Sequence, residues 1–118
     1  MTIGDLSIEQ RTDADGRVLV LELRGELDIA TAATLTRTVA RVALQRLVVD
    51  LQAVTVLDST GVRSLLHTRR WMVNHGGEAR FVCDGGPAGR TIELMGLRDA
   101  LGVCPDYASA VAGFPADP

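Results

Sequence analysis

The chain has 118 residues and a net charge of −3, and 47% of its residues are hydrophobic although only 3% are aromatic. This length is enough for one domain with a sizeable core, packed here from Leu, Val, Ile and Ala. All 12 basic residues are arginines scattered along the chain, so no basic patch indicates nucleic acid or a membrane surface. We expect one cytoplasmic domain over 1–118, with its core at about 3–112 and a tail at 113–118.

The first third of the chain has the pattern of a β-hairpin followed by a helix. Apolar alternation predicts strands over 3–11 and 17–24, joined by a turn at 13–16. Residues 25–28 end the second strand, and Thr31 can serve as the N-cap of a helix. The apolar stripe of that helix consists of Ala32, Leu35, Val39 and Val42.

The middle of the chain carries the strongest signals. Residues 47–51 predict a buried strand, which continues through 54–57 into Asp58-Ser59-Thr60-Gly61. A helical pattern follows from Val62 to Asn74 and stops at His75-Gly76-Gly77. The apolar positions of this helix are Val62, Leu65, Leu66, Met72 and Val73.

The last third supplies one more core strand and several short elements. We predict a strand over 79–83, a turn at 84–87 and a short helix whose apolar residues span 92–97. An edge strand at 101–103 and a helix at 107–114 complete the chain. A hairpin followed by alternating helices and strands predicts an α/β fold, with about four helices packed on a mixed sheet of four to five strands.

The sequence Asp58-Ser59-Thr60-Gly61 lies between a buried strand and a helix. Unpaired N–H groups and the positive end of the helix dipole favour an anion there, so Ser59 is a candidate phosphorylation site. The alternative is simple capping, in which Asp58 or Ser59 accepts a first-turn hydrogen bond worth roughly 1 kcal/mol. Asp28 follows an earlier strand, where it either lies beside Ser59 or belongs to a solvated turn.

Other motifs give no indication of catalysis. Residues 85–91 lack the spacing and the lysine of a phosphate-binding loop. Cys83 and Cys104 have no neighbouring ligand residues, and we expect both to be reduced thiols. His67 and His75 have no partner at the spacing of a metal site or a catalytic triad. We therefore expect no metal, no cofactor and no enzymatic activity.

Four blocks of sequence carry a resemblance to a known family: residues 23–28, 47–62, 75–80 and 92–97. The second block is the most specific, because it joins the buried strand to Asp58-Ser59-Thr60-Gly61. The four blocks follow one another in the order found in the STAS family, and they cover nearly the full length of the chain. The chain therefore resembles the STAS family, whose fold is that of bacterial anti-sigma factor antagonists.

The resemblance implies a role for each residue that matches the pattern. In such antagonists the serine directly after the aspartate of the second block is phosphorylated, and here that position is Ser59. The partner-binding residues of the family correspond to Asp28, Asp58, Thr60, Gly61 and Val62. The implied partners are an anti-sigma factor that is also a serine-protein kinase, and a phosphatase that removes the phosphate from the serine.

We therefore expect an anti-sigma factor antagonist that regulates transcription by partner switching. It would bind the anti-sigma factor when Ser59 is unphosphorylated and be released on phosphorylation. One alternative is a non-switching STAS accessory subunit of a lipid transporter or sensory complex, in which Ser59 would be only a cap. A small-molecule enzyme is a third possibility, for which the sequence offers no catalytic constellation.

Overall fold

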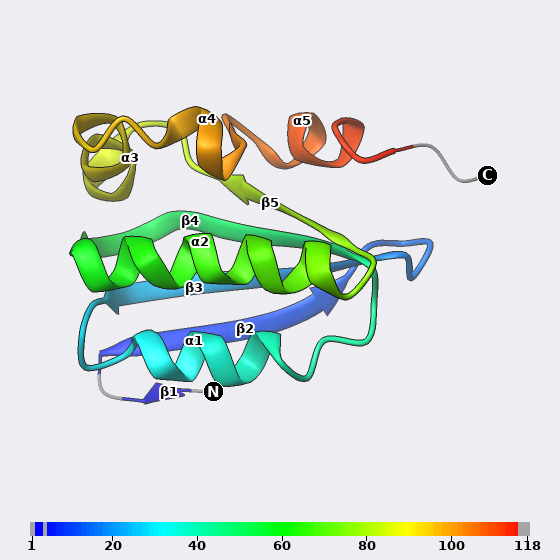
Figure 1. Ribbon diagram of the computed structural model, residues 1–118, viewed down its shortest axis with the longest axis horizontal. Coiled ribbons are helices and arrows are strands. Elements are labelled where there is room, and N and C mark those ends of the chain that lie inside the picture. The colour runs from blue at the N-terminus through cyan, green and yellow to red at the C-terminus, as the bar shows by residue number, and fades with distance from the viewer. Residues whose placement is uncertain (1, 4, 116–118) are drawn as a thin grey trace.

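The computed structural model describes residues 2–3 and 5–115, which form alternating strands and helices after an initial hairpin (Figure 1). The strands are β1 (Thr2–Ile3), β2 (Leu6–Thr12), β3 (Val18–Leu27), β4 (Arg46–Leu57), β5 (Glu78–Val82) and β6 (Val103–Cys104). The helices are α1 (Ala32–Val39), α2 (Ser59–Asn74), α3 (Gly86–Leu94), α4 (Arg98–Leu101) and α5 (Tyr107–Ala112). The predicted α/β class is confirmed.

The described strands form one mixed sheet of six strands in the order β1-β2-β3-β4-β5-β6. Strands β1, β2 and β3 pair antiparallel, whereas β3, β4, β5 and β6 pair in parallel. The count exceeds the predicted four to five because the strand expected over 3–11 is divided in two. Its first part, β1, folds back so that Thr2 lies opposite Ser7 of β2.

The predicted hairpin between β2 and β3 is confirmed, and Asp13 closes its turn. Asp13 Oδ1 accepts hydrogen bonds from the backbone N–H groups of Arg17 (2.8 Å) and Val18 (3.0 Å). Gly16 completes the turn with a φ of 69°, a conformation that glycine adopts at little cost. These contacts join residues close together in the sequence, which is why the turn could be predicted from the local sequence alone.

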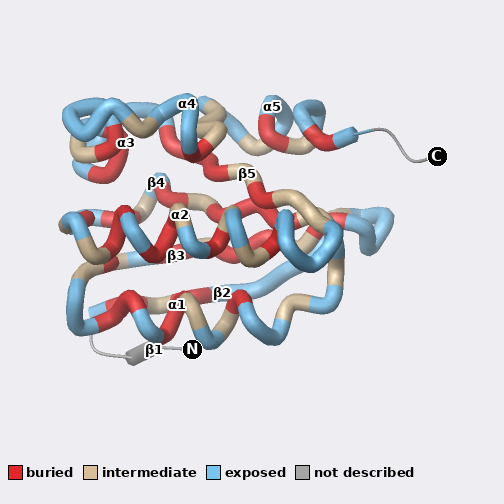
Figure 2. The backbone as a smooth tube through the Cα atoms, in the orientation of Figure 1, coloured by how far each residue is buried: buried red, intermediate tan, exposed pale blue. Residues whose placement is uncertain are grey.

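Helices α1 to α4 pack on one face of the sheet, and α5 packs on the other. The larger core cluster contains Leu35 of α1, Leu65 of α2, Ile92 of α3 and Leu101 of α4. The smaller cluster combines Val18, Val20, Val48 and Val82 of the sheet with Ala110 and Phe114. Figure 2 shows buried residues along the strands and on the helices, and α1 lies beside α2 across the sheet. No described helix is long and apolar enough to cross a membrane.

Helix α2 begins at Ser59 and ends at Asn74, with its C-terminal stop as predicted. Val62, Leu65 and Met72 are fully buried, whereas Leu66 is only partly buried and Val73 is 53% exposed. Since each helical residue turns the side chain by about 100°, the residue after Met72 points away from the sheet.

The structure corrects the predicted turn at 84–87 and the short helix over 92–97. Helix α3 already starts at Gly86, and Pro87 fits its first turn because no intrahelical N–H bond is required there. Ile92 is buried as a core residue, but Leu94 is 82% exposed because it lies on the opposite side of the helix.

The C-terminal elements also differ from the expectation. The sequence pattern does not predict α4, which ends at Gly102 with a φ of 63°. As a result the edge strand lies at Val103–Cys104 instead of 101–103. The tail expected at 113–118 is ordered at Phe114, whose side chain packs in the smaller core cluster. Residues 116–118 of that tail lie outside the described residues.

Candidate functional site

The site is built where β3 and β4 end side by side. Leu27, the last residue of β3, is in register with Leu57, the last residue of β4. The backbone N–H of Asp58 lies 3.4 Å from the carbonyl oxygen of Leu27. Because the strands are parallel, Asp28 and Asp58 both emerge at the same edge of the sheet, where α2 begins (Figure 1). The structure thus brings together the two segments that carry the predicted site residues.

Asp58 is the N-cap of α2 and also holds the neighbouring loop. Its Oδ1 accepts a hydrogen bond from the N–H of Gly61 (2.8 Å), as capping predicts. Its Oδ2 accepts a second bond from the N–H of Ile29 (3.1 Å), a residue of the loop between β3 and α1. One carboxylate therefore sets the position of that loop relative to the first turn of α2.

The loop over 28–31 is further held by its own polar groups and by the end of β3. The N–H of Asp28 donates to Thr31 Oγ1 (3.0 Å), and this hydroxyl donates to the carbonyl of Glu26 (2.7 Å). Asp28 Oδ1 accepts from the N–H of Ala30 (3.0 Å). Thr31 does occupy the N-cap position of α1, but its side chain makes no capping bond because it bonds back to the loop. The loop consequently presents Ile29 outward.

Ser59 is the first residue of α2, and its side chain is exposed. Within the described residues its hydroxyl has no hydrogen-bond partner, because Asp58 performs the capping that either residue was predicted to perform. Thr60 beside it is half-buried. The arrangement leaves the Ser59 oxygen accessible at the positive end of the helix dipole.

Gly61 and Val62 lie beneath this surface. A Cβ on Gly61 would be 2.2 Å from the Leu27 carbonyl oxygen and 2.8 Å from Leu57 Cδ1, so only glycine lets α2 approach β3 this closely. Val62 is 1% exposed and belongs to the larger core. Both residues therefore set the position of the first turn of α2, and neither offers a side chain to the outside.

Carboxylates surround the site on the side of the loop. Glu26 precedes Asp28, and its backbone N–H donates to the carbonyl of Asp5 (3.0 Å). A side-chain hydrogen bond with Asp5, reinforced by the negative charges of Asp5 and Asp28, raises the pKa of Glu26. Asp28, which precedes Ile29, and Asp58, which accepts the Ile29 N–H, make the loop side of the surface near Ser59 acidic.

Sequence reasoning missed two features of this surface. Ile29 is 78% exposed although it is large and apolar, and it lies next to Asp58. A groove of about 250 Å³ also runs between α1 and α2 beside Thr60. The residues that line the groove are Ala32, Thr36, Thr60, Arg63, Ser64 and His67. The small residues at four-residue spacing on both helices were the available signal, but only the packing of α1 against α2 shows that they face each other.

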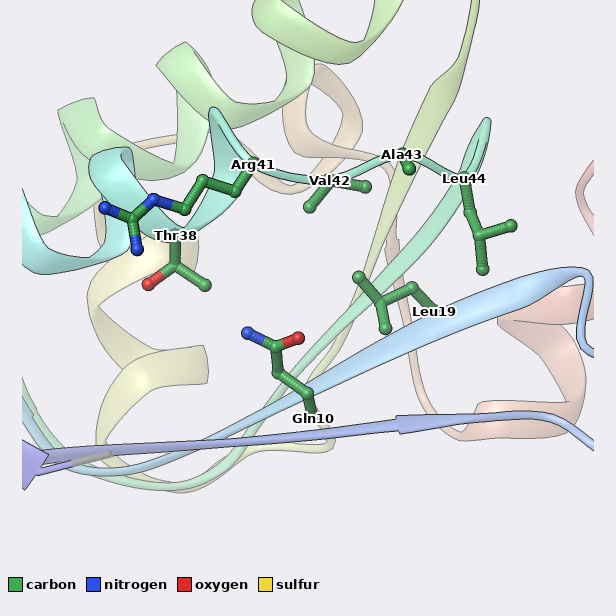
Figure 3. A pocket seen from close by; sticks show the side chains of 7 residues that line it. All are labelled: Gln10, Leu19, Thr38, Arg41, Val42, Ala43 and Leu44. Carbon is green, nitrogen blue, oxygen red and sulfur yellow. The ribbon is translucent and has the colours of Figure 1, made fainter.

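A second hollow lies away from this site, beyond the end of α1. It measures about 220 Å³, and Gln10 and Leu19 of the sheet face the segment from Thr38 to Leu44 across it (Figure 3). Arg41 is its only charged residue. Over the described part of the chain, no group of three or more His, Cys, Asp or Glu side chains could hold a metal ion.

The two cysteines lie on opposite faces of the sheet. Cys83 is buried in the larger cluster, where burial raises the pKa of its thiol. Cys104 packs against the smaller cluster, and both are free thiols. Their thiol groups therefore do not face each other, although the backbone N–H of Cys83 donates to the carbonyl of Cys104 (2.9 Å).

Several solved structures have a fold similar to this one. An anti-sigma factor antagonist from Mycobacterium paratuberculosis has a similar structure, with a TM-score of 0.76 and 29% identity over 95% of this chain and 97% of that one. The anti-sigma factor antagonist SpoIIAA in its unphosphorylated form matches with a TM-score of 0.65 and 18% identity, over 93% of this chain and all of that one (100%). The phosphorylated form of SpoIIAA, a Bacillus cell fate determinant, matches with a TM-score of 0.60 and 18% identity over 90% and 97% of the two chains.

The family model of the STAS domain matches residues 9–110. This range includes β3, β4 and the start of α2, and hence every residue of the predicted site. The chain belongs to the STAS domain family.

Proposed function

We propose that this protein is an anti-sigma factor antagonist that regulates transcription by partner switching in the cytoplasm. With Ser59 unphosphorylated, it binds an anti-sigma factor that is also a serine kinase and so displaces the sigma factor. Phosphorylation of Ser59 releases it, and a phosphatase restores the free serine. The observation that carries the proposal is the accessible Ser59 hydroxyl, which Asp58 leaves without a capping role.

The chemistry requires only an acceptor from this chain. Ser59 Oγ attacks the γ-phosphorus of ATP, ADP leaves with the electron pair of the broken P–O bond, and the serine proton passes to a base of the kinase. Nucleotide and magnesium belong to the kinase. The antagonist needs no cofactor and performs no catalysis of its own.

The fold should tolerate the phosphate. Ser59 is exposed and lies outside both core clusters, so the added group needs no space in the interior. The start of a 16-residue helix favours negative charge through its dipole and its free N–H groups. The switch therefore acts on the surface and leaves the packing of the domain unchanged.

The same phosphate should prevent partner binding. The exposed Ile29 and the groove beside Thr60 offer an apolar contact surface, which is bordered by Asp28 and Asp58. Phosphorylation adds a charge of about −1.5 to −2 to this already acidic edge. A partner that fits the free hydroxyl then meets repulsion and a desolvation cost, and a 1,000-fold loss of affinity requires only about 4 kcal/mol.

Phosphate mapping and calorimetry test the proposal. The wild type, Ser59→Ala and Thr60→Val are incubated with the cognate anti-sigma factor kinase and ATP, and the phosphate is located by mass spectrometry. We expect phosphate on Ser59 in the wild type and in Thr60→Val, and none in Ser59→Ala. Ser59→Ala should fold normally because Asp58 keeps its cap, and should bind the anti-sigma factor as the unmodified wild type does.

Two results would contradict the switch. One is phosphate on Thr60 of the wild type, the rival hydroxyl at the same helix start. The other is equal affinity before and after modification of Ser59. Constitutive binding without phosphorylation would instead support a non-switching accessory subunit.

A further inference from the structure

Arg63 lies one helical turn after Ser59 on the exposed side of α2. Side chains four residues apart on a helix are neighbours, with their Cβ atoms about 5–6 Å apart. An anion placed N-terminal to a cation at this spacing is the more favourable order. A phosphate on Ser59 would therefore be within reach of the guanidinium group of Arg63.

Arg63 has no hydrogen bond or ion pair within the part of the chain that the structure describes. Other arginines are engaged: Arg11 Nε lies 2.9 Å from Glu22 Oε1, and Arg69 Nε lies 3.5 Å from Glu78 Oε1. The carboxylate of Asp58, the N-cap of α2, already accepts one backbone bond on each oxygen. Arg63 is thus an uncommitted cation beside the proposed phosphorylation site.

We infer that Arg63 is the internal counterion of phosphorylated Ser59. The inference rests on the proposed function, since it concerns the phosphorylated form. The planar guanidinium group donates two parallel hydrogen bonds to phosphate oxygens, a pairing that is shorter and stronger than one between neutral groups. The pair forms within α2 and requires no movement of the backbone.

Pairing with the phosphate changes the groove as well as the serine. In the unphosphorylated protein Arg63 lines the groove with Thr60 and His67, where it can receive a carboxylate of the partner. Once paired, its charge is no longer offered to the partner. Phosphorylation therefore adds a negative charge at one point of the surface and withdraws a positive charge at another.

The test measures the second pKa of the phosphate by ³¹P NMR titration, a quantity near 6 for free phosphoserine. Phosphoserine is placed at position 59 of the full chain by genetic encoding, in the wild type and in Arg63→Gln, Arg63→Lys and Arg70→Gln. Other charged or titratable groups near the phosphate are Asp58 at the N-cap of α2, Asp28 in the loop, Glu26 at the end of β3, and His67 on α2. They are present in all four proteins, so the differences isolate the substituted arginine.

We expect Arg63→Gln to raise the phosphoserine pKa by about half a unit, the size of an exposed ion pair. Arg63→Lys should give an intermediate value, because it keeps the charge but loses the paired geometry. Arg70 is exposed on the same side of α2 but lies seven residues further on, about 10 Å along the axis. Arg70→Gln should therefore titrate as the wild type.

Equal titration of the wild type and Arg63→Gln would overturn the inference, and so would an equal shift in Arg70→Gln. Arg63→Lys keeps the test decisive if the glutamine variant unfolds. Since the phosphoserine is encoded, these results do not depend on any kinase. A negative result leaves the phosphorylation of Ser59 untouched, and a kinase that ignores Ser59 leaves the titration interpretable.

Discussion

The two ends of the sheet are stabilised in different ways. The site end comprises residues 26–31 and 57–63, and the hairpin end comprises residues 13–17, 41–45 and 75–77; they lie at opposite ends of α2 (Figure 1). At the site end Asp58 joins two segments whose bonded residues are 29 positions apart. At the hairpin end Asp13 bonds to residues only four and five positions away.

The glycines at the two ends also differ in whether they contact distant parts of the chain. Gly61 presses against the backbone of β3, whereas Gly16 has open space where a Cβ would stand. The comparison indicates that the hairpin end is a local turn, while the site end is a junction that depends on the whole fold. A surface used for recognition gains from such a junction, because its exposed residues are held by contacts below them.

A core substitution in the middle of α2 should give the largest loss of stability, with which substitutions at the two ends can be compared. Leu65→Ala should cost about 2–5 kcal/mol of unfolding free energy, because Leu65 is fully buried in the larger core. Leu66 is only partly buried, so Leu66→Ala should cost clearly less. Urea denaturation of both variants measures the difference. Equal losses would mean that the helix packs on a different face.

Gly61→Ala should strongly destabilise the site end. Its Cβ would overlap the Leu27 carbonyl oxygen, and we expect a loss of about 3 kcal/mol, at the upper end for overpacking. The control is Gly16→Ala at the hairpin end, where the left-handed backbone alone costs about 1 kcal/mol. Thermal and urea unfolding of both variants measures the two losses of stability. A larger loss in Gly16→Ala than in Gly61→Ala would contradict the proposed difference between the two ends.

Asp58→Ala should loosen the junction. Loss of the cap costs about 1–2 kcal/mol, and the Ile29 N–H loses its acceptor as well. Hydrogen exchange at Ile29 should accelerate. Asp106 is a matched control, because it caps α5 through Ser109 N–H without joining a second segment. Asp106→Ala should leave exchange at Ile29 unchanged, and an equal acceleration in both variants would exclude a bridging role for Asp58.

The smallest expected effect is a pH dependence of opposite sign at the two ends. The Asp5 side chain raises the pKa of Glu26 above its ordinary value of 4.5, so the folded state takes up this proton first. Stability from Glu26 therefore increases as the pH falls through that raised pKa toward 4.5. The hydrogen bond from Val18 N–H lowers the pKa of Asp13 below 3.8, so its contribution is present above 3.8 and is lost as the pH falls below it.

Urea midpoints measured between pH 3 and 7 check both signs. Glu26→Gln should abolish the increase in stability that the wild type shows as the pH falls toward 4.5. Asp13→Asn should abolish the decrease in stability that the wild type shows as the pH falls below 3.8. A Glu26→Gln profile that matches the wild type would show that Glu26 keeps its ordinary pKa in the folded protein.

Most regular elements could be predicted because their signals are local. The turn at 13–16, the long strand ending at Leu57 and the helix after Asp58 all depend on residues close together in the sequence. Helix α4 could not be predicted, because four residues carry no helical period and its formation depends on burying Leu101 in the core. The early start of α3 was missed since Gly86 and Pro87 have the composition of a turn.

The sequence by itself determined that a helix begins close to Asp58-Ser59-Thr60-Gly61, that either Asp58 or Ser59 caps it, and that Ser59 is exposed at its start. Capping and exposure follow from the residue types and their order, so no distant contact is needed. Only the tertiary structure decided that Asp58 holds the loop of Asp28, that Ile29 faces outward and that Val62 is buried. These features depend on the parallel register of β3 and β4, which brings together residues that are far apart in the chain.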